Sequence, residues 1–129
     1  MDKTWEDLLQ EARIKVRPVA VSRMMQIGRV ATALMTKNGT IYTGICIETK
    51  CSLGMCAEKN AISNMLANGE YDIDMICTIN DEGFVMPPCG ACREFMIQLG
   101  PEAKGIKVLV DNDGNYVELR ALLPIYPYI

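Results

Sequence analysis

Two short segments of the sequence carry residue types that bind and use a metal ion. They are Cys-Ala-Glu at residues 56–58 and Pro-Cys-Gly-Ala-Cys at residues 88–92. Cys89 and Cys92 stand three positions apart, so on a helix their thiols share one face and can hold one ion. A third thiolate from Cys56 would leave one tetrahedral position open for water. Three protein ligands with one open position are typical of catalytic zinc, so the two segments predict a catalytic zinc site.

Glu58 follows the first cysteine by two positions and is the candidate proton carrier. A carboxylate there can reach across the metal without binding it, take a proton from water and deliver it to a substrate nitrogen. Zinc with three thiolates has a formal charge of about −1, which weakens its polarisation of water. Both cysteine segments open predicted helices, whose partial positive charge favours thiolates. Lys59 and Arg93 are further cations that could offset this charge.

The remaining cysteines leave one other zinc arrangement open. Cys51 could add a fourth ligand, which would close the coordination sphere and make the site structural. Cys46 and Cys77 fall in predicted strands, where a cysteine is usually a small buried hydrophobic residue. The sequence has no histidine, which excludes imidazole ligands and histidine-activated nucleophiles. The N-terminal segment has no signal-peptide pattern, so reduced or metal-bound thiols are expected rather than disulfides.

The spacing of apolar residues predicts the elements that position these segments. We expect helices over residues 5–16, 56–68 and 89–99, strands over residues 30–36, 40–47, 73–79, 106–110 and 116–119, and a helical turn within residues 118–123. Thr4 and Asp7 resemble a capping box for the first helix. Asn38-Gly39 predicts a hairpin between the first two strands. The link from residue 110 to residue 116 is too short for a parallel crossover, so the last two strands must be antiparallel if they pair.

Length, composition and charge restrict the class of protein. Half of the 129 residues are apolar and the formal net charge is −3. One domain spanning residues 1–129 is expected. The acidic excess argues against a nucleic-acid partner, which would need a basic surface. No apolar run approaches the roughly 20 residues of a membrane span, so we expect no membrane partner and a cytoplasmic protein.

The Cys-Ala-Glu and Pro-Cys-x-x-Cys motifs together resemble those of the zinc deaminases of nucleobases. The all-cysteine version in a short chain is similar to that of the tetrameric cytidine deaminases. The resemblance covers roughly residues 30–124, through segments 36–39, 43–44, 47–48, 56–58, 88–93 and 122–124. It implies an α/β fold, a three-layer αβα sandwich with a five-stranded mixed sheet. It also implies one zinc ion per chain, a pyrimidine nucleoside substrate, a role in pyrimidine salvage and a homotetramer with shared active sites.

On the substrate side, the sequence departs from this family at two places. The family holds the ribose hydroxyls with an Asn-x-Glu pair, whereas here Cys46 stands in place of the asparagine and Glu48 matches the glutamate. The family also has a phenylalanine before its first strand, and residues 27–29 contain no aromatic side chain. By resemblance, the backbone N–H of Ala57 holds the pyrimidine edge. The departures bring the sequence closer to blasticidin S deaminase, which is not expected to keep Glu48.

The expected function is therefore hydrolytic deamination of cytidine- or 2′-deoxycytidine-type nucleosides to the uridine form, with release of ammonia. Three alternatives stay open. One is a blasticidin S deaminase-like enzyme, one is a deaminase fold that only binds, and one is a structural zinc protein with Cys51 as fourth ligand. The apolar tail at residues 124–129 is expected to pack between subunits, or to close a neighbour's pocket with Tyr126 or Tyr128.

Overall fold

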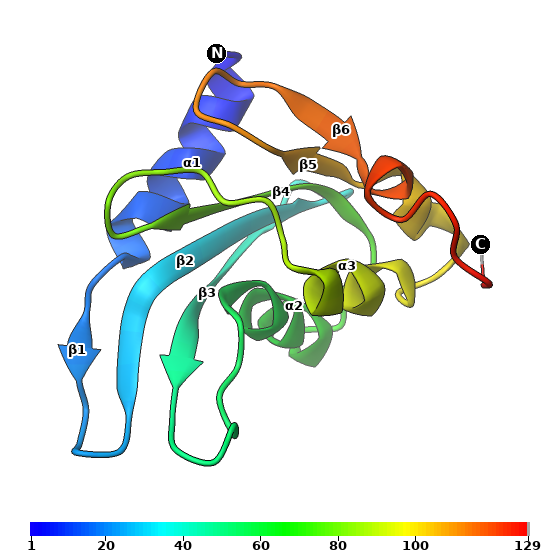
Figure 1. The fold of residues 1–129 in the computed structure, drawn as a ribbon. Helices are drawn as coiled ribbons and strands as arrows, with labels where there is room; N and C mark the ends of the chain where they lie inside the picture. Colours follow the sequence, from blue (N-terminus) through cyan, green and yellow to red (C-terminus); the bar gives the residue numbers. More distant parts are fainter. Residues whose placement is uncertain (129) are drawn as a thin grey trace.

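The computed structural model describes residues 1–128, which form a mixed sheet between two helical layers (Figure 1). The helices are α1 (Lys3–Lys15), α2 (Ala57–Ala67) and α3 (Gly90–Ile97). The strands are β1 (Val19–Ala20), β2 (Gln26–Thr36), β3 (Ile41–Glu48), β4 (Ile73–Asn80), β5 (Lys107–Leu109) and β6 (Tyr116–Glu118). Short 3₁₀ helices span Pro101–Gly105 and Leu119–Leu122. The predicted α/β class and its order of main elements are confirmed.

The sheet has six strands, one more than predicted, and its long strand β2 lies at the centre of the pairing. β2 runs antiparallel to β3 on one side and to β1 and β4 on the other. β5 is parallel to β4, and β6 is antiparallel to β5. The mixed sheet and the antiparallel last pair are therefore confirmed. The unpredicted strand is β1, whose two residues are too few to show a hydrophobic period.

Two element boundaries at the N-terminal end differ from the prediction. The first helix is capped by Asp2, whose carboxylate accepts the N–H of Thr4 at 2.7 Å, rather than by a Thr4–Asp7 box. β2 begins at Gln26 instead of residue 30. The pairing of β2 with β3 shifts register after Ile27, next to Gly28, which has a positive φ of 83°. This bulge interrupts the alternation by which a strand is identified from sequence.

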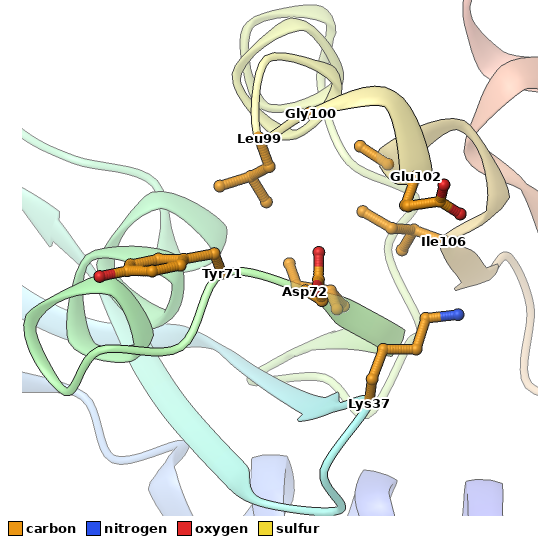
Figure 2. A pocket seen from close by; sticks show the side chains of 9 residues that line it. Lys37, Tyr71, Asp72, Leu99, Gly100, Glu102 and Ile106 are labelled. Atoms are coloured by element: carbon orange, nitrogen blue, oxygen red, sulfur yellow. The ribbon is translucent and has the colours of Figure 1, made fainter.

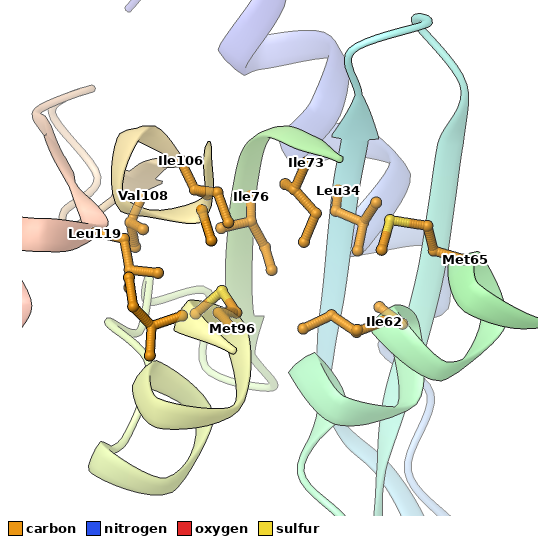
Figure 3. Packing of buried hydrophobic residues seen from close by; sticks show 12 residues of the cluster. Leu34, Ile62, Met65, Ile73, Ile76, Met96, Ile106, Val108 and Leu119 are labelled. Carbon is orange, nitrogen blue, oxygen red and sulfur yellow. The ribbon is translucent and has the colours of Figure 1, made fainter. Parts of the chain in front are cut away.

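Alternate residues of the central strands face opposite helical layers, as the pleat of a sheet requires. Leu34 and Ile76 point toward α2 and α3, where they meet Ile62 and Met96 (Figure 3). On the other face the sheet packs against α1, with Trp5 and its neighbours along that helix in the core. The predicted αβα layering is confirmed.

Helix α2 approaches β3 closely because Gly44 has no side chain. A Cβ at Gly44 would overlap the backbone nitrogen of Ala61 in the middle of α2. The side chain of Asn60 adds a hydrogen bond from α2, its Oδ1 accepting the N–H of Ile45 at 2.9 Å. The start of α2, which carries the Cys-Ala-Glu motif, is thereby fixed over the sheet.

Candidate metal centre

Three cysteines meet where α2 and α3 begin. Cys56 is the N-cap residue of α2, Cys89 is the N-cap residue of α3, and Cys92 lies in the first turn of α3. The Sγ atoms of Cys56 and Cys89 are 4.0 Å apart, and all three sulfur atoms lie within 4.8 Å of one another. The predicted metal-ligating cysteines therefore form one cluster.

The topology explains why two segments distant in sequence come together. β3 and β4 flank β2 and both run antiparallel to it, so both end at the same edge of the sheet. The chain leaves this edge once into α2 and once into α3, on the same face of the sheet (Figure 1). The N-termini of the two helices therefore converge.

The donor set fits a zinc ion. Three thiolates can occupy three corners of a tetrahedron around zinc, with Zn–S bonds of about 2.3 Å. Among residues 1–128, the cluster does not include Cys51, which is exposed in the loop after β3. The closed four-cysteine arrangement that would favour a structural site is therefore not formed. A tetrahedral zinc ion held by these three thiolates would have one coordination position left for water.

The environment affects the three thiols differently. The backbone N–H of Cys92 lowers the pKa of the Cys89 thiol, as expected at a helix start. Burial instead raises the pKa of the Cys56 thiol and that of the Cys92 thiol. A bound zinc ion would stabilise the thiolate form of all three.

Glu58 lies beside the cysteines in the first turn of α2, and only 7% of its surface is exposed. Burial raises the pKa of its carboxyl group, while hydrogen bonds from its own backbone N–H, from Thr78 and from Cys92 act in the opposite direction. A carboxyl group with a raised pKa exchanges protons more readily near neutral pH. The position of Glu58 is thus suited to proton transfer.

A cavity of about 180 Å³ opens next to the cysteine cluster. Its lining consists of Val30, Cys46, Cys56, Ala57, Glu58, Thr78, Met86, Pro87 and Cys89. Apolar walls with a few convergent polar groups are typical of a small-molecule site. The cavity brings together Cys46, Ala57 and Glu58, which the sequence assigned separately to substrate binding and catalysis.

Glu48 lies just beyond this cavity, at the end of β3. The Sγ atom of Cys46 lies 3.8 Å from Oε1 of Glu48, and the guanidinium of Arg29 lies 4.0 Å from Oε2. Cys46 and Glu48 point to the same side of the strand because they are two positions apart. The pair therefore extends the site from the cysteine cluster along β3.

The two cations that the sequence analysis placed near zinc have other contacts. The ammonium of Lys59 lies 5.3 Å from the centre of the Phe95 ring. Arg93 donates from Nε to the carbonyl of Pro88 at 2.7 Å and reaches the carbonyl of Leu122 at 3.4 Å. Arg93 thus fixes the residue before Cys89. The charge compensation by both cations stays a prediction.

The sequence analysis missed several residues of this site, among them Thr78, Met86 and Asn112. Thr78 and Met86 line the cavity, and Asn112 holds the loop that contains Met86. The side chain of Asn112 accepts the N–H of Val85 and donates to the carbonyl of Gly83, both at 2.9 Å. A polar residue at an inward position of an apolar strand is the signal that could have identified Thr78.

A separate cavity lies at the opposite end of β4 (Figure 2). It is lined by residues including Lys37, Tyr71, Asp72, Leu99 and Glu102, and its volume is about 10 Å³. This is room for about one water molecule. It is therefore too small for a substrate.

The C-terminal tail contacts the rest of its own chain through Tyr126. The Tyr126 hydroxyl donates a hydrogen bond to Glu94 of α3 at 2.9 Å. It accepts a hydrogen bond at 3.2 Å from Gln98, the C-cap residue of α3. Ile125 and Tyr128 are 97% and 81% exposed. Residue 129, the last of the predicted apolar tail, lies outside the described residues. Within the described chain, every helix falls short of the length and apolar character that a membrane crossing requires.

The comparisons with known proteins agree on one family. The model of the family described as cytidine and deoxycytidylate deaminase zinc-binding region matches residues 6–107. A cytidine deaminase of Halalkalibacterium halodurans is 37% identical over 101 residues, covering 74% of each chain. A blasticidin-S deaminase of Bacillus cereus is 31% identical over 107 residues, again covering 74% of each chain. The crystal structure of cytidine deaminase from Mycobacterium tuberculosis matches with a TM-score of 0.80 at 24% identity, over 99% of this chain and 100% of that one, which shows the shared fold.

Proposed function

Because this chain belongs to the cytidine and deoxycytidylate deaminase zinc-binding family, we propose that it is a zinc-dependent hydrolase of cytidine- or 2′-deoxycytidine-type nucleosides. The reaction replaces the 4-amino group of the cytosine ring with oxygen, consumes one water and releases ammonia. The observation that carries the proposal is the meeting of three thiols and a buried carboxylate at one cavity. Water addition at an amidine carbon needs these two functions, an activated nucleophile and a proton carrier.

The chain's own residues divide the chemistry between metal binding and proton transfer. Cys56, Cys89 and Cys92 would hold zinc, which when bound lowers the pKa of water and so supplies the nucleophile. Glu58 accepts a proton from the attacking water and delivers it to N3 of the ring. Glu58 then carries the second proton to the amino group, so that the C4–N4 bond breaks with neutral ammonia as the leaving group. The apolar walls around Glu58 exclude bulk water from these transfers.

The proposed substrate contacts extend from the cysteine cluster through the cavity to the end of β3. The backbone N–H of Ala57, at the first position of α2, holds the pyrimidine edge. Glu48 accepts hydrogen bonds from the sugar hydroxyls. Cys46 lines the cavity between them and supplies a small, weakly polar side chain where the family uses an amide. Sugar recognition thus depends mainly on Glu48. The guanidinium of Arg29 lies 4.0 Å from this carboxylate and 3.6 Å from that of Asp81.

A modified cytosine nucleoside of the blasticidin S type is the alternative substrate. Two observations favour it, namely Cys46 in place of the family asparagine and the 31% identity to a blasticidin-S deaminase. The retained Glu48 favours an ordinary nucleoside. A structural zinc protein is disfavoured by the position of Cys51 outside the cluster.

We also propose a homotetramer that acts on free nucleosides in the cytoplasm, within pyrimidine salvage. Exposed apolar side chains on the loops around the site support assembly, since such a patch is usually covered by another protein surface. They include Met24 between β1 and β2, Leu53 after β3 and Met86 after β4. The net charge of −3 supports a free nucleoside over a polyanion.

The test is a substrate panel with the purified, zinc-assayed protein. Cytidine, 2′-deoxycytidine and blasticidin S are compared by absorbance change and by ammonia release. Turnover of cytidine or deoxycytidine with the highest kcat/KM is the expected result. Preference for blasticidin S would support the alternative, and zinc-loaded protein that releases ammonia from none of the three would contradict the proposed function.

A further inference from the structure

The side chain of Arg93 joins two segments of the chain that meet at the start of α3. Arg93 follows Cys92 directly in that helix and is partly buried. Its Nε donates to the carbonyl of Pro88 at 2.7 Å, and its Nη1 donates to the carbonyl of Leu122 at 3.4 Å. Pro88 immediately precedes Cys89, and Leu122 is the last residue of the C-terminal 3₁₀ helix. One guanidinium therefore connects the backbone next to a metal-ligating cysteine with the C-terminal part of the chain.

The segment before Cys89 depends on a donor from elsewhere. Cys89 is the most exposed of the three clustered cysteines, so packing holds it least. Residues 87 and 88 are both prolines, which have no backbone N–H to donate. Before this pair, the N–H of Met86 bonds to the carbonyl of Thr78, and after it, the N–H of Arg93 bonds to the carbonyl of Cys89. Between these two backbone hydrogen bonds, the charged side chain of Arg93 supplies a donor, which binds a carbonyl more strongly than a neutral donor does.

The other end of this connection lies on a firmly packed element. The C-terminal 3₁₀ helix (Leu119–Leu122) begins with Leu119, which is fully buried. Leu119 belongs to the same core cluster as Met96 of α3 (Figure 3). Its N–H donates to the carbonyl of Ile106 at 2.8 Å, just before β5. The carbonyl of Leu122 therefore belongs to a part of the chain that the core holds in place.

We propose that Arg93 is a positioning residue for Cys89, and that the C-terminal 3₁₀ helix thereby supports the metal centre. By tying the carbonyl of Pro88 to that helix, Arg93 fixes the backbone from which the Cys89 thiol extends. A ligand that is already in place loses less conformational freedom when zinc binds, so the affinity for zinc is higher. Groups that orient metal ligands typically contribute roughly 10- to 100-fold in affinity. The proposal rests on the zinc centre of the proposed function, but not on deamination.

This role differs from the charge compensation that the sequence analysis assigned to Arg93. Charge compensation needs only a cation near the thiolates, whereas the connection needs a planar group that donates in two directions. Arg93→Lys separates the two roles. It keeps the positive charge, but its single ammonium nitrogen replaces two guanidinium nitrogens that bond to carbonyls of different segments. Arg93→Gln removes the charge as well.

The experiment measures zinc affinity by competition with a chromogenic chelator, using the purified protein. Arg93→Lys and Arg93→Gln are both expected to bind zinc about 10- to 100-fold more weakly than the wild type. Two matched controls leave the Pro88 carbonyl bonded. Tyr126→Phe removes hydrogen bonds between the tail and α3, and Arg120→Gln removes a cation of the C-terminal 3₁₀ helix that pairs with Glu118. Both controls should bind zinc within about twofold of the wild type, even where the Tm falls.

The variants distinguish positioning from its alternatives. Wild-type zinc affinity in Arg93→Lys would overturn the proposal, because a positive charge alone would then account for Arg93. An equal loss of affinity in Tyr126→Phe would also contradict it, since general loosening of α3 would then explain the effect. If Arg93→Gln fails to fold, Arg93→Lys and the two controls decide the question. A wild type that binds zinc but deaminates no nucleoside would contradict the proposed function alone, and the zinc affinities would still decide the role of Arg93.

Discussion

The Sγ atoms of Cys56 and Cys89 lie 4.0 Å apart although 33 positions separate the two residues. Each cysteine is the N-cap residue of its helix. An N-cap residue stands at the junction between a loop and a helix, so its position depends on both. The geometry of the metal centre is therefore set by the two loops that end at these cysteines.

The loops before Cys56 and Cys89 are held in the same way. Each folds back on the strand that it leaves, so that Met55 pairs with Ile47 and Val85 pairs with Ile79, both antiparallel. Next to Met55, a Cβ on Gly54 would overlap the carbonyl of Ile47, so only glycine permits this approach. Short backbone pairings on either side of β2 thus position the two cysteines. These pairings keep the distance between the cysteines fixed before a metal binds.

The first prediction concerns metal content. The wild type is expected to bind about one zinc ion per chain, because three thiolates at two helix starts bind zinc tightly. Cys89→Ala should lose most of the zinc and lower the Tm. Cys51→Ser is the matched control, and it should keep both, since Cys51 lies outside the cluster. Elemental analysis of the dialysed proteins measures the zinc content. Zinc loss in Cys51→Ser would show that Cys51 is a fourth ligand and would contradict the three-cysteine site.

The second prediction separates metal binding from chemistry. Glu58→Gln keeps the shape of the side chain but cannot accept a proton. Zinc content should stay at the wild-type level while kcat falls by about 10²–10⁴-fold, the range for a general acid–base group. Steady-state kinetics on the preferred nucleoside, together with elemental analysis, provide the check. A variant that kept more than about a tenth of the wild-type kcat would refute the role of Glu58.

The third prediction concerns the loop between β4 and α3. Asn112→Ala removes both hydrogen bonds that hold Gly83 and Val85, and so frees the cavity wall at Met86. The KM for the nucleoside should rise by about three- to tenfold, as loosening this wall weakens binding by roughly the worth of one hydrogen bond. Asn115→Ala is the control in the same turn, because the Asn115 side chain donates its hydrogen bond within the turn, to Asp111. Equal KM values for the two variants would show that the loop holds its position without Asn112.

The parts of this protein that the sequence predicted are those with local signals. The helix starts at both cysteine segments follow from motif and spacing, and the antiparallel last pair follows from the short link before Tyr116. The Asp2 cap and the bulge at Gly28 lie in segments without a repeating hydrophobic period. Thr78 and Asn112 contact partners 46 and 27 positions away, at Thr32 and Val85. Such contacts are created by strand pairing and have no signature within one segment.

The fourth prediction concerns stability in acid. The carboxylate of Glu70 accepts hydrogen bonds from the Tyr42 hydroxyl at 2.7 Å and from Asn38 at 3.2 Å. These contacts, the Tyr42 hydroxyl foremost, lower the pKa of Glu70 to about 2. Since the pKa is lowered by folding, this stabilisation is present above the unfolded value of about 4.3 and is lost as the pH falls from there toward 2.

Glu70→Gln should therefore lower the Tm at pH 6. Between pH 5 and pH 2 the Tm of this variant should decrease less than the Tm of the wild type. Thermal melts followed by circular dichroism across this range measure the effect. Glu11→Gln, at an exposed position of α1, is the control for the loss of one negative charge. If both variants had the same pH dependence, the hydrogen bonds to Tyr42 and Asn38 would contribute nothing to acid stability.

The last prediction distinguishes the two roles of the C-terminal tail. Tyr126 is bonded to Glu94 and Gln98 of its own chain, so it anchors the tail on α3. Tyr126→Phe removes these bonds and should lower the Tm by a few degrees, without changing the oligomeric state. Ile125 and Tyr128 are 97% and 81% exposed, which leaves them available to a neighbouring subunit. Ile125→Ser/Tyr128→Ser should therefore weaken assembly.

Sedimentation velocity across a concentration series, with kinetics at the same concentrations, separates these effects. If neighbouring subunits of the proposed tetramer complete each pocket, the double variant should lose kcat/KM as it dissociates. It should regain kcat/KM at protein concentrations where the proposed tetramer forms again. Unchanged kinetics in a fully dissociated double variant would show that each subunit holds a complete pocket. A double variant that stays tetrameric, with wild-type kinetics and only a lower Tm, would instead mean that the tail packs on its own chain alone, as Tyr126 already does.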